Sequence, residues 1–265
     1  MRIHVTETAI HSKAADRWGP IILYNGCTMS RRQMGSRYAT YFLLDKYGFD
    51  WMILDKEKCC GSPVRRSGGF NLADELRDYN LDQAVKAGVN TMVTACPGCG
   101  SQLLSEEAEE RGIKIRHTIE MYYDLAKDHE LYLPEYMIDI PHLKVTAHFP
   151  CHLQRGMGID LEKVHSTIIG EFPNMEYIPL PEADVCCGAG GGVRASQKPL
   201  SFKIRERKIK NVIRTDADIV LNACSFCELQ IDEGLREINS HTRAIMPQGL
   251  IAMMFRDIGK EVERL

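Results

Sequence analysis

The sequence contains no long apolar run and carries little net charge. Its longest apolar stretches, such as Ile21–Tyr24 and Trp51–Leu54, are far shorter than the ~18–20 residues of a membrane-spanning helix. Residues 1–7 lack the apolar segment of a secretory signal. With 33 basic and 36 acidic side chains the formal charge is −3, too close to neutral for binding nucleic acid or anionic lipid through bulk charge. We therefore expect a cytoplasmic protein with no membrane span and no nucleic-acid partner.

The composition also lacks the biases of disordered, fibrous or disulfide-stapled proteins. Of the 265 residues, 44% are hydrophobic and 26% are charged, which is typical of a soluble globular protein with a full core. At roughly 100–200 residues per domain, this length allows one large domain or two modest ones. Ten cysteines are too dilute for a small disulfide scaffold, which typically exceeds about 8–10% cysteine. In a reducing cytosol, such cysteines more often bind metal or carry out redox chemistry.

The cysteines form two sets of five with the same internal order. The first set comprises Cys27, Cys59, Cys60, Cys96 and Cys99. The second set comprises Cys151, Cys186, Cys187, Cys224 and Cys227. Equivalent members are separated by 124, 127, 127, 128 and 128 residues. The chain is therefore a duplicated module of about half its length, and every cysteine belongs to one copy.

The pattern around the cysteines predicts alternating strands and helices. Short apolar runs typical of buried parallel strands comprise Ile21–Tyr24, Trp51–Leu54, Thr91–Ala95, Leu143–Ala147, Tyr177–Leu180 and Asp218–Ala223, with a further strand near Ile113–Ile115. Helices are predicted between them over Arg37–Lys46, Asn71–Lys86, Ser101–Glu110, Leu161–Ile169 and Ser201–Arg214. We therefore expect an α/β fold of two pseudo-symmetric Rossmann-like modules with parallel sheets.

The expected organisation is an N-terminal extension followed by two domains. Residues 1–19 have no counterpart in the second half and form the extension. The first domain covers 20–135 and the second 136–265, with a linker within His129–Pro141. Ligands of open α/β sheets lie beyond the carboxyl ends of the strands. Because each cysteine group follows a predicted strand, we expect one five-thiolate site at that edge of each sheet.

Three kinds of site would use these thiolates. Disulfides would absorb all ten cysteines, but the expected reducing compartment disfavours them. Structural zinc suits a Cys-x-x-Cys half-site, but it takes four ligands where each half supplies five, two of them adjacent. An iron–sulfur cluster offers several metal atoms, so that adjacent cysteines can ligate different irons. We favour iron–sulfur clusters and keep zinc as the alternative.

Glycines follow each Cys-Cys pair. Gly61 follows the first pair, and Gly188, Gly190, Gly191 and Gly192 follow the second. Glycine lets the backbone approach a bulky cluster without a side-chain clash, and backbone N–H groups can hydrogen-bond to cluster sulfur. The glycine run lacks the G-x-G-x-x-G register of a dinucleotide loop, so a nucleotide site is the weaker interpretation.

The spacing resembles that of a known family. The repeats read Cys-x(31)-Cys-Cys-Gly-x(34)-Cys-x-x-Cys and Cys-x(34)-Cys-Cys-Gly-x(35)-Cys-x-x-Cys. Over about residues 20–235, this pattern resembles the tandem CCG domain of heterodisulfide reductases. The segments Phe149–Leu153 and Cys186–Val193 are similar to the second repeat of that family. Without a ferredoxin-type cysteine run, the chain resembles the separate B subunit, although its second repeat is closer to the fused D form.

The resemblance implies iron–sulfur chemistry on a disulfide. Each cysteine set would hold one non-cubane [4Fe-4S] cluster, and the two clusters would face a shared cavity where the coenzyme M–coenzyme B disulfide of methanogenesis is cleaved. Some relatives carry zinc at one site, but all ten ligands are present here, so we expect both clusters. The implied substrate is a small anionic disulfide. The implied partners are a ferredoxin-like iron–sulfur subunit and a flavin-containing electron-input subunit of a larger complex.

Histidines and arginines near the cysteines complete the candidate site. His148 and His152 flank Cys151 and would donate hydrogen bonds or protons to a leaving thiolate, although local capping or packing stays open. Six arginines that follow cysteine groups would bind the anionic groups of a substrate, namely Arg31, Arg32, Arg65, Arg66, Arg155 and Arg194. The alternative is that each is a solvated surface arginine.

Two other functions stay open. The chain would serve as an electron-transfer CCG subunit of a lactate-, glycolate- or sulfur-oxidising complex without disulfide reductase activity, or as a zinc-stabilised assembly module. Metal analysis separates the zinc module from the other two, and an assay with the heterodisulfide separates the first function from the electron relay.

Overall fold

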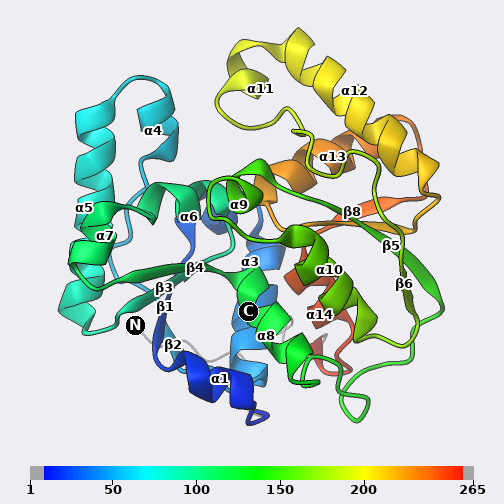
Figure 1. The fold of residues 1–265 in the computed structure, drawn as a ribbon, viewed down its shortest axis with the longest axis horizontal. Coiled ribbons are helices and arrows are strands. Elements are labelled where there is room, and N and C mark those ends of the chain that lie inside the picture. The colour runs from blue at the N-terminus through cyan, green and yellow to red at the C-terminus, as the bar shows by residue number, and fades with distance from the viewer. Residues whose placement is uncertain (1–8, 259–265) are drawn as a thin grey trace.

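The computed structural model describes residues 9–258 and builds each half on a four-stranded parallel sheet (Figure 1). The first sheet has the order β2-β1-β3-β4 and comprises β1 (Ile21–Tyr24), β2 (Trp51–Met52), β3 (Thr91–Thr94) and β4 (Lys114–His117). The second sheet has the order β6-β5-β7-β8 and comprises β5 (Leu143–His148), β6 (Met175–Tyr177), β7 (Ile219–Asn222) and β8 (Arg243–Ile245). The equivalent orders confirm the α/β fold of two parallel-sheet modules.

Helices connect the strands in both halves. The first half contains α1 (Lys13–Trp18), α2 (Gly26–Arg31), α3 (Met34–Lys46), α4 (Ser62–Arg66), α5 (Phe70–Ala87), α6 (Pro97–Leu103), α7 (Glu106–Glu110) and α8 (Thr118–Lys127). The second half contains α9 (Cys151–Gln154), α10 (Leu161–Gly170), α11 (Val193–Ser196), α12 (Lys198–Arg214), α13 (Ser225–Glu237) and α14 (Pro247–Met253). Within residues 9–258, none of these helices combines the length and apolar character needed to cross a membrane.

The structure departs from the predicted elements in several places, and the helices α1, α8, α13 and α14 were not predicted. The helix predicted over Ser101–Glu110 is two helices, because Leu104 is extended and the Ser105 side chain caps α7 by accepting a hydrogen bond from Ala108 N. The strand predicted at Tyr177–Leu180 lies earlier, as β6, since prolines at 179 and 181 offer no N–H to a sheet. The short edge strand β8 was not predicted, because its three residues carry no recognisable period.

The described part of the N-terminal segment folds onto the first half. Ser12 caps α1 by accepting a hydrogen bond from Ala15 N at 3.1 Å. Trp18 donates from Nε1 to Asp124 Oδ2 on α8 at 3.0 Å. Residues 1–8, on which the expectation about a secretory signal rests, and residues 259–265 of the expected second domain lie outside the described residues.

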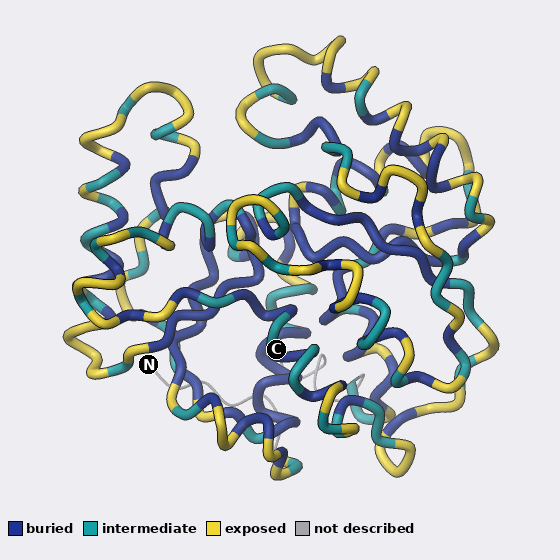
Figure 2. The backbone as a smooth tube through the Cα atoms, viewed as in Figure 1, coloured by how far each residue is buried: buried dark blue, intermediate teal, exposed yellow. Residues whose placement is uncertain are grey.

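One buried hydrophobic cluster extends through both halves. α3 packs against α14, and α8 packs against α10. The ring of Phe255 packs against Phe42 of α3 and against Tyr47, the residue after α3, with centroid distances of 5.4 and 5.9 Å. Figure 2 shows buried backbone running through both sheets and the helices between them. This shared core fixes the cysteine loops of one half relative to those of the other.

Candidate metal centre

All ten cysteines lie just beyond strands, as the sequence predicts. In each half the lone cysteine belongs to the short helix after the first strand, α2 or α9. The Cys-Cys pair lies in the loop after β2 or β6, and the Cys-x-x-Cys pair opens the helix after β3 or β7. Parallel strands bring these loops to one edge of each sheet. Figure 1 shows α6, α9 and α13 near one another between the sheets, and α6 packs against α9.

Within each set, each thiol affects the pKa of the next, which places the five thiols in a linear order. The first chain runs in the order Cys27, Cys59, Cys60, Cys99 and Cys96. The second chain runs in the order Cys151, Cys186, Cys187, Cys227 and Cys224. The Sγ atoms of Cys187 and Cys227 are 3.2 Å apart. The two orders match member for member, so the repeat in sequence is also a repeat in geometry.

Each chain of thiols reaches the surface at one end and is buried at the other. Cys27 is exposed, and Cys59, Cys151 and Cys186 are half-buried. The remaining cysteines are buried, namely Cys60, Cys96, Cys99, Cys187, Cys224 and Cys227. The lone cysteine and its neighbour therefore lie nearest to any molecule that arrives from solvent.

One thiol in each chain ionises most readily. Hydrogen bonds from Cys59 and then from Cys99 lower the pKa of Cys60 to about 5, despite its burial. In the second chain, a hydrogen bond from Cys151 is the main cause that holds the pKa of Cys186 well below its usual range. Thiolates rather than thiols bind metals. In each set one thiol is therefore more acidic than its neighbours and is the first that would bind a metal as a thiolate.

The glycines after the Cys-Cys pairs are required by the backbone itself. Gly61 and Gly188 have φ of +88° and +84°, a region that favours glycine. An added Cβ would lie 2.7 Å from a backbone oxygen of α5 at Gly61, and 2.8 Å from one of α12 at Gly188. These glycines thus allow close approach to a helix, a reason the sequence did not reveal. Gly188 also donates its N–H to Cys186 Sγ at 3.3 Å, which is the predicted kind of bond to sulfur.

Side chains of the two halves meet beside the cysteine loops. Arg66, in α4, hydrogen-bonds to the Nε2 atom of His152, the residue after the lone cysteine of the second set. Cys99 is the main cause that lowers the pKa of Cys96 to about 7, and Ser225, a residue of the second half, lies close enough to contribute. We call the region marked by Arg66, His152, Cys96 and Ser225 the junction. Both cysteine sets border it.

The six predicted arginines differ in what they contact. Three lie beside acidic side chains, in the pairs Arg65–Asp74, Arg155–Asp184 and Arg194–Glu233. Arg66 reaches the junction. The side chains of Arg31 and Arg32 are exposed and form no hydrogen bond or ion pair with the described part of the chain. Arg31, Arg32 and Arg66 therefore have no carboxylate partner within residues 9–258 and are suited to bind an anion.

The two predicted histidines occupy different environments. His152 is half-buried at the junction, and burial is the first cause that lowers its pKa. His148 is fully buried at the end of β5, where burial lowers its pKa to about 3. Its Nδ1 atom donates to Ala183 O at 2.9 Å, since a carbonyl oxygen only accepts. The neutral ring therefore has no second proton to donate to a neighbouring sulfur.

A carboxylate that the sequence analysis missed holds the start of α2. Glu57 accepts hydrogen bonds from Asn25 N at 2.8 Å and Gly26 N at 2.7 Å. Burial raises its pKa to about 7. The bonds fix the loop that leads into Cys27. No sequence motif marks this role, because it depends on the approach of the Cys-Cys loop to α2.

Asn80 and Lys208, also missed, hold the loops before the Cys-Cys pairs. Asn80 accepts from Lys58 N at 3.0 Å and donates to Cys59 O at 3.3 Å. Lys208, which is buried in α12, donates to Ala183 O at 3.2 Å. The two positions are 128 residues apart, an offset shared with the cysteines. Aligning the two halves would therefore have revealed these residues.

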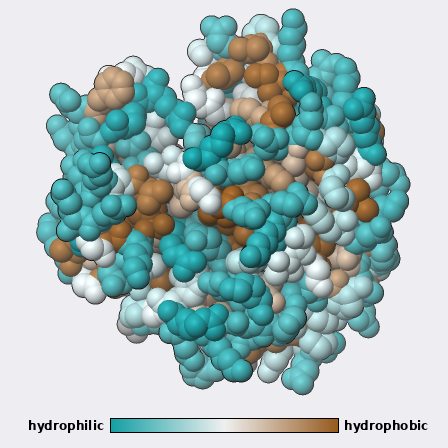
Figure 3. All heavy atoms as spheres, viewed as in Figure 1, coloured by the Kyte–Doolittle hydropathy of each residue, from teal (hydrophilic) through white to brown (hydrophobic). Residues whose placement is uncertain are grey.

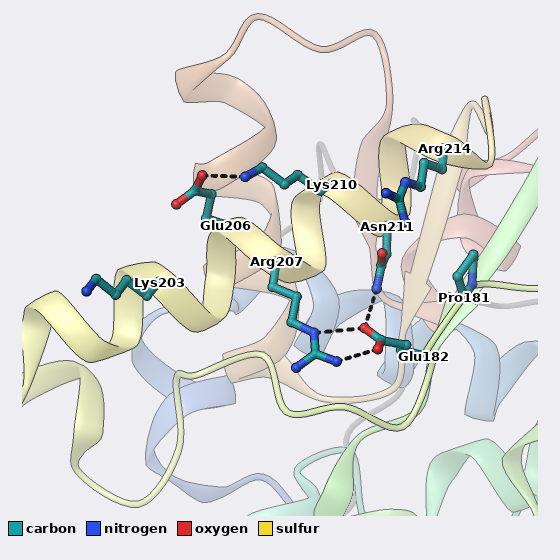
Figure 4. A pocket seen from close by; sticks show the side chains of 8 residues that line it. All are labelled: Pro181, Glu182, Lys203, Glu206, Arg207, Lys210, Asn211 and Arg214. Atoms are coloured by element: carbon teal, nitrogen blue, oxygen red, sulfur yellow. Dashed lines mark hydrogen bonds and ion pairs between the residues drawn. The ribbon is translucent and has the colours of Figure 1, made fainter.

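A surface hollow lies away from the cysteines, on the outer side of α12 (Figure 4). Its volume is about 460 Å³, and it is lined by Pro181, Glu182, Lys203, Glu206, Arg207, Lys210, Asn211 and Arg214. In this hollow Arg207 pairs with Glu182 and Lys210 with Glu206. No lining residue is a cysteine or a junction residue, so this hollow is separate from the thiol sites.

Apolar side chains are exposed on two projections of the molecule. One projection is formed by α4 and the start of α5, and carries Phe70 and Leu72. The other is formed by α11 and the start of α12, and carries Leu200 and Phe202. Figure 3 shows the surface indented between the two projections, with apolar atoms gathered on them. Such paired apolar tips are available for contact with another chain.

The donor set fits a polynuclear metal group. All ten cysteines are free thiols, and the closest approach of Cys187 and Cys227 is longer than a disulfide bond of about 2.0 Å. Five sulfur donors exceed the four of a tetrahedral zinc ion. A cluster with several metal atoms uses all five. The residues that would hold it are the first set in one half and the second set in the other.

The repeat and its geometry match a described protein family. Residues 21–104 and 145–232 match the cysteine-rich domain family, CCG. The chain belongs to this family. Each matched segment contains all five cysteines of its half. The tandem CCG pattern expected from the spacing is thus confirmed.

Several curated relatives of this CCG chain are reductase subunits. It is 28% identical to the B subunit of the fumarate reductase (CoM/CoB) of Methanothermobacter marburgensis, over 88% of this chain and 46% of the relative. It is 29% identical to the D subunit of the dihydromethanophenazine:CoB–CoM heterodisulfide reductase of Methanosarcina acetivorans, over 95% of this chain and 62% of the relative. It is 29% identical to the B subunit of the ferredoxin:CoB-CoM heterodisulfide reductase of Methanosarcina mazei, over 82% of this chain and 81% of the relative. The chain thus spans about half to two thirds of the length of several curated relatives that it matches.

Proposed function

We propose that this chain is the iron–sulfur subunit of a reductase complex that cleaves a disulfide, with the coenzyme M–coenzyme B disulfide as its substrate. The observation that carries the proposal is the pair of equivalent five-thiol sets on either side of one junction. A disulfide has two sulfur ends, and a pseudo-symmetric pair of sites suits such a substrate. The names of two relatives, the B and D subunits of heterodisulfide reductases, support this assignment.

Each set would hold one non-cubane [4Fe-4S] cluster. The support is the presence of five free cysteines on neighbouring loops in each half, which fits several iron atoms better than one zinc ion. When bound, such clusters supply electrons one at a time. Zinc has no accessible redox state, so a site that held zinc would serve only to bind or position.

The proposed reaction balances with two electrons and two protons. The S–S bond of the substrate breaks, and each sulfur takes one electron and one proton, so that two thiols form. Arg66 only donates hydrogen bonds, so the Nε2 atom of His152 accepts and its Nδ1 atom carries the hydrogen. His152 can therefore donate a hydrogen bond from Nδ1 to a sulfur atom bound at the junction.

Arg31, Arg32 and Arg66 would bind the anionic groups of the substrate. None of them is paired with a carboxylate among residues 9–258. A guanidinium presents paired N–H donors that match carboxylate, phosphate or sulfonate oxygens. Arg65, Arg155 and Arg194 are closer to acidic partners and contribute less to the charge of such a site.

The electrons would arrive from other subunits. We infer a ferredoxin-like iron–sulfur subunit and a flavin-containing electron-input subunit as partners in a larger complex. The exposed apolar tips Phe70, Leu72, Leu200 and Phe202 support contact with another chain. The names of the relatives, which are subunits of reductases, also support partner subunits.

The second candidate is an electron-transfer subunit that performs no disulfide chemistry. The similarity to the B subunit of a fumarate reductase favours it. An assay of the complex, purified without oxygen, decides between the two. With a reduced viologen as electron donor, we expect turnover of the coenzyme M–coenzyme B disulfide. Intact clusters without that turnover would assign the electron-transfer role instead.

A further inference from the structure

The two thiol sites differ at one position that lies beside the cysteines in both halves. Tyr24 and His148 are 124 residues apart, the same offset that separates the two lone cysteines, and each lies three residues before its lone cysteine. They end the equivalent strands β1 and β5. Both side chains are 0% exposed. The second half therefore carries an imidazole where the first carries a phenol.

Tyr24 keeps its polar atom away from the first set. Its hydroxyl donates to Lys58 O at 2.6 Å. Cys60 and Cys99 lie near its ring, and a Cβ added at Gly26 would lie 2.8 Å from Cys99 Sγ and 3.6 Å from the ring. The hydroxyl is thus satisfied by the backbone, and the first set consists of sulfur donors alone.

His148 has a free nitrogen beside the second set. Its Nδ1–H is committed to Ala183 O, and its Nε2 is buried without a partner among the described residues. A ring nitrogen of His148 and the Sγ atoms of Cys187 and Cys227 all lie within 4.8 Å of one another. Cys187 and Cys227 are the equivalents of Cys60 and Cys99. The imidazole therefore lies beside the same pair of thiols that the tyrosine approaches in the first half.

The surroundings fix the imidazole in the form that binds metal. An Nδ1–H bonded to a backbone carbonyl leaves a lone pair on Nε2 and sets the ring orientation, as in most metal-ligating histidines. The buried ammonium of Lys208 donates to the same carbonyl of Ala183. That second bond holds the acceptor in place. In the first half, the equivalent Asn80 holds the loop at the Cys-Cys pair. The position equivalent to His148 is occupied there by Tyr24.

We propose that His148 is a sixth ligand of the second set and binds metal through Nε2. The first site then offers five sulfur atoms, and the second offers five sulfur atoms and one nitrogen. This inference rests on the proposed function only in that the second set holds metal. The second site then carries a neutral nitrogen donor that the first site lacks.

Two other buried histidines show that a free Nε2 is not sufficient evidence. His117 and His165 also have Nε2 atoms without a partner. Neither belongs to a group of three metal-ligating side chains in the part of the chain that the structure describes. His165 donates from Nδ1 to Leu161 O at 2.8 Å, so it has the same kind of backbone bond as His148. It provides a matched control.

The experiment compares three proteins, purified without oxygen in their complex and labelled with ¹⁵N-histidine. The test variant is His148→Asn, because an asparagine amide can keep the bond to Ala183 O while Nε2 is removed. The control is His165→Asn, which makes the same change away from the thiols. Pulsed electron paramagnetic resonance of the reduced protein detects histidine nitrogen bound to iron. X-ray absorption at the zinc edge does so if the second set holds zinc.

We expect a directly bound histidine nitrogen in the wild type and in His165→Asn, and none in His148→Asn. Metal release from one site to a chelator should become on the order of 10-fold faster or more in His148→Asn, with the other site unchanged. A wild-type spectrum with sulfur ligands only would overturn the proposal, and so would a nitrogen signal that persists in His148→Asn. The wild-type spectrum decides even if the variant does not fold.

The outcome is separable from that of the proposed function. Nitrogen ligation without turnover of the disulfide supports the role of His148 and contradicts the disulfide reductase assignment. Turnover of the disulfide with metal bound by sulfur alone supports the disulfide reductase assignment and contradicts the role of His148. Different measurements therefore test the two conclusions.

Discussion

Single cysteines show how closely the two sites correspond. Cys60 and Cys187 occupy the middle of the two thiol chains, and both are buried. Their spacing in sequence was sufficient to predict that they belong to equivalent sites. The order of contacts within each chain was not predictable, because it depends on how the Cys-Cys loop meets the Cys-x-x-Cys helix.

Replacing either central cysteine with serine should abolish disulfide reduction. A hydroxyl is a poorer ligand for iron than a thiolate, so Cys60→Ser and Cys187→Ser should each distort or lose only their own cluster. Turnover is measured with reduced viologen, and the clusters are followed by spectroscopy. A variant that lost one cluster yet kept near-normal turnover would contradict a mechanism that uses both sites.

Arg66 should contribute to binding the anionic substrate. Hydrogen bonds between charged groups contribute about 1.5–3 kcal/mol, so Arg66→Ala should raise KM by about 10–100-fold, with a smaller effect on kcat. Arg155→Ala is the control, because Arg155 is an exposed arginine near Asp184. Equal KM values for the two variants would contradict a role of Arg66 in binding the substrate.

The roles of the histidines could not be predicted from their positions beside Cys151. His152, one residue after Cys151, is half-buried at the junction, and His148, three residues before Cys151, is fully buried. Which ring nitrogen is free depends on Ala183 and Arg66, and these residues come from other loops. Sequence spacing identifies candidates here, whereas tertiary contacts decide their chemistry.

At the scale of elements, the sequence predicted the strands up to β7 and the helices α3, α5, α10 and α12 because their patterns are regular, but it did not predict α8 or α13. The helix predicted over Asn71–Lys86 is α5, and Gly88 ends it in a left-handed conformation. Other errors fall where local chemistry interrupts the pattern, as at Ser105, or where a strand is short, as at β8. The cysteine loops have no period of their own, and they were placed correctly only because strands precede them.

One helix terminus gives the protein a pH-dependent stability. His117 caps α8, because its Nδ1 accepts from Ile119 N at 3.1 Å while Glu120 accepts from His117 N at 2.7 Å. A protonated imidazole cannot accept a hydrogen bond. Burial lowers the pKa of His117 to about 3, against about 6.5 for an unfolded histidine.

The sign of this effect follows from proton binding. Between pH 6.5 and 3 the unfolded chain binds a proton at His117 that the folded chain excludes, so stability falls as the pH falls through that window. The contribution is at most about 1.4 kcal/mol per pH unit. His117→Asn keeps a capping side chain and removes the titration. Denaturant unfolding at several pH values should give a shallower slope for this variant, and identical slopes would refute the assignment.

For the whole molecule, the shared core matters most. The sequence predicted two modules joined by a linker, but it did not predict that α3 and α14 pack together or that Phe255 packs against Phe42 and Tyr47. Contacts between segments some 200 residues apart leave no local pattern. These contacts nevertheless fix the positions of the two cysteine sets relative to each other across the junction.

We therefore expect the two halves to unfold together. Phe255→Ala should lower the free energy of unfolding by about 3–5 kcal/mol, as for other buried phenylalanines, and should destabilise both halves. Tryptophan fluorescence reports the first half, which holds Trp18 and Trp51, and hydrogen exchange at β7 reports the second. Phe70→Ala, at an exposed tip, is the control. Destabilisation confined to one half would show that the halves are independent.

Iron and sulfide analysis tests most directly whether both thiol sites hold clusters. The protein is purified without oxygen, and iron, zinc and acid-labile sulfide are measured per chain. Two four-iron clusters predict about eight iron atoms and about eight sulfides per chain, with little zinc. Stoichiometric zinc with little iron, or iron sufficient for a single cluster, would contradict the account.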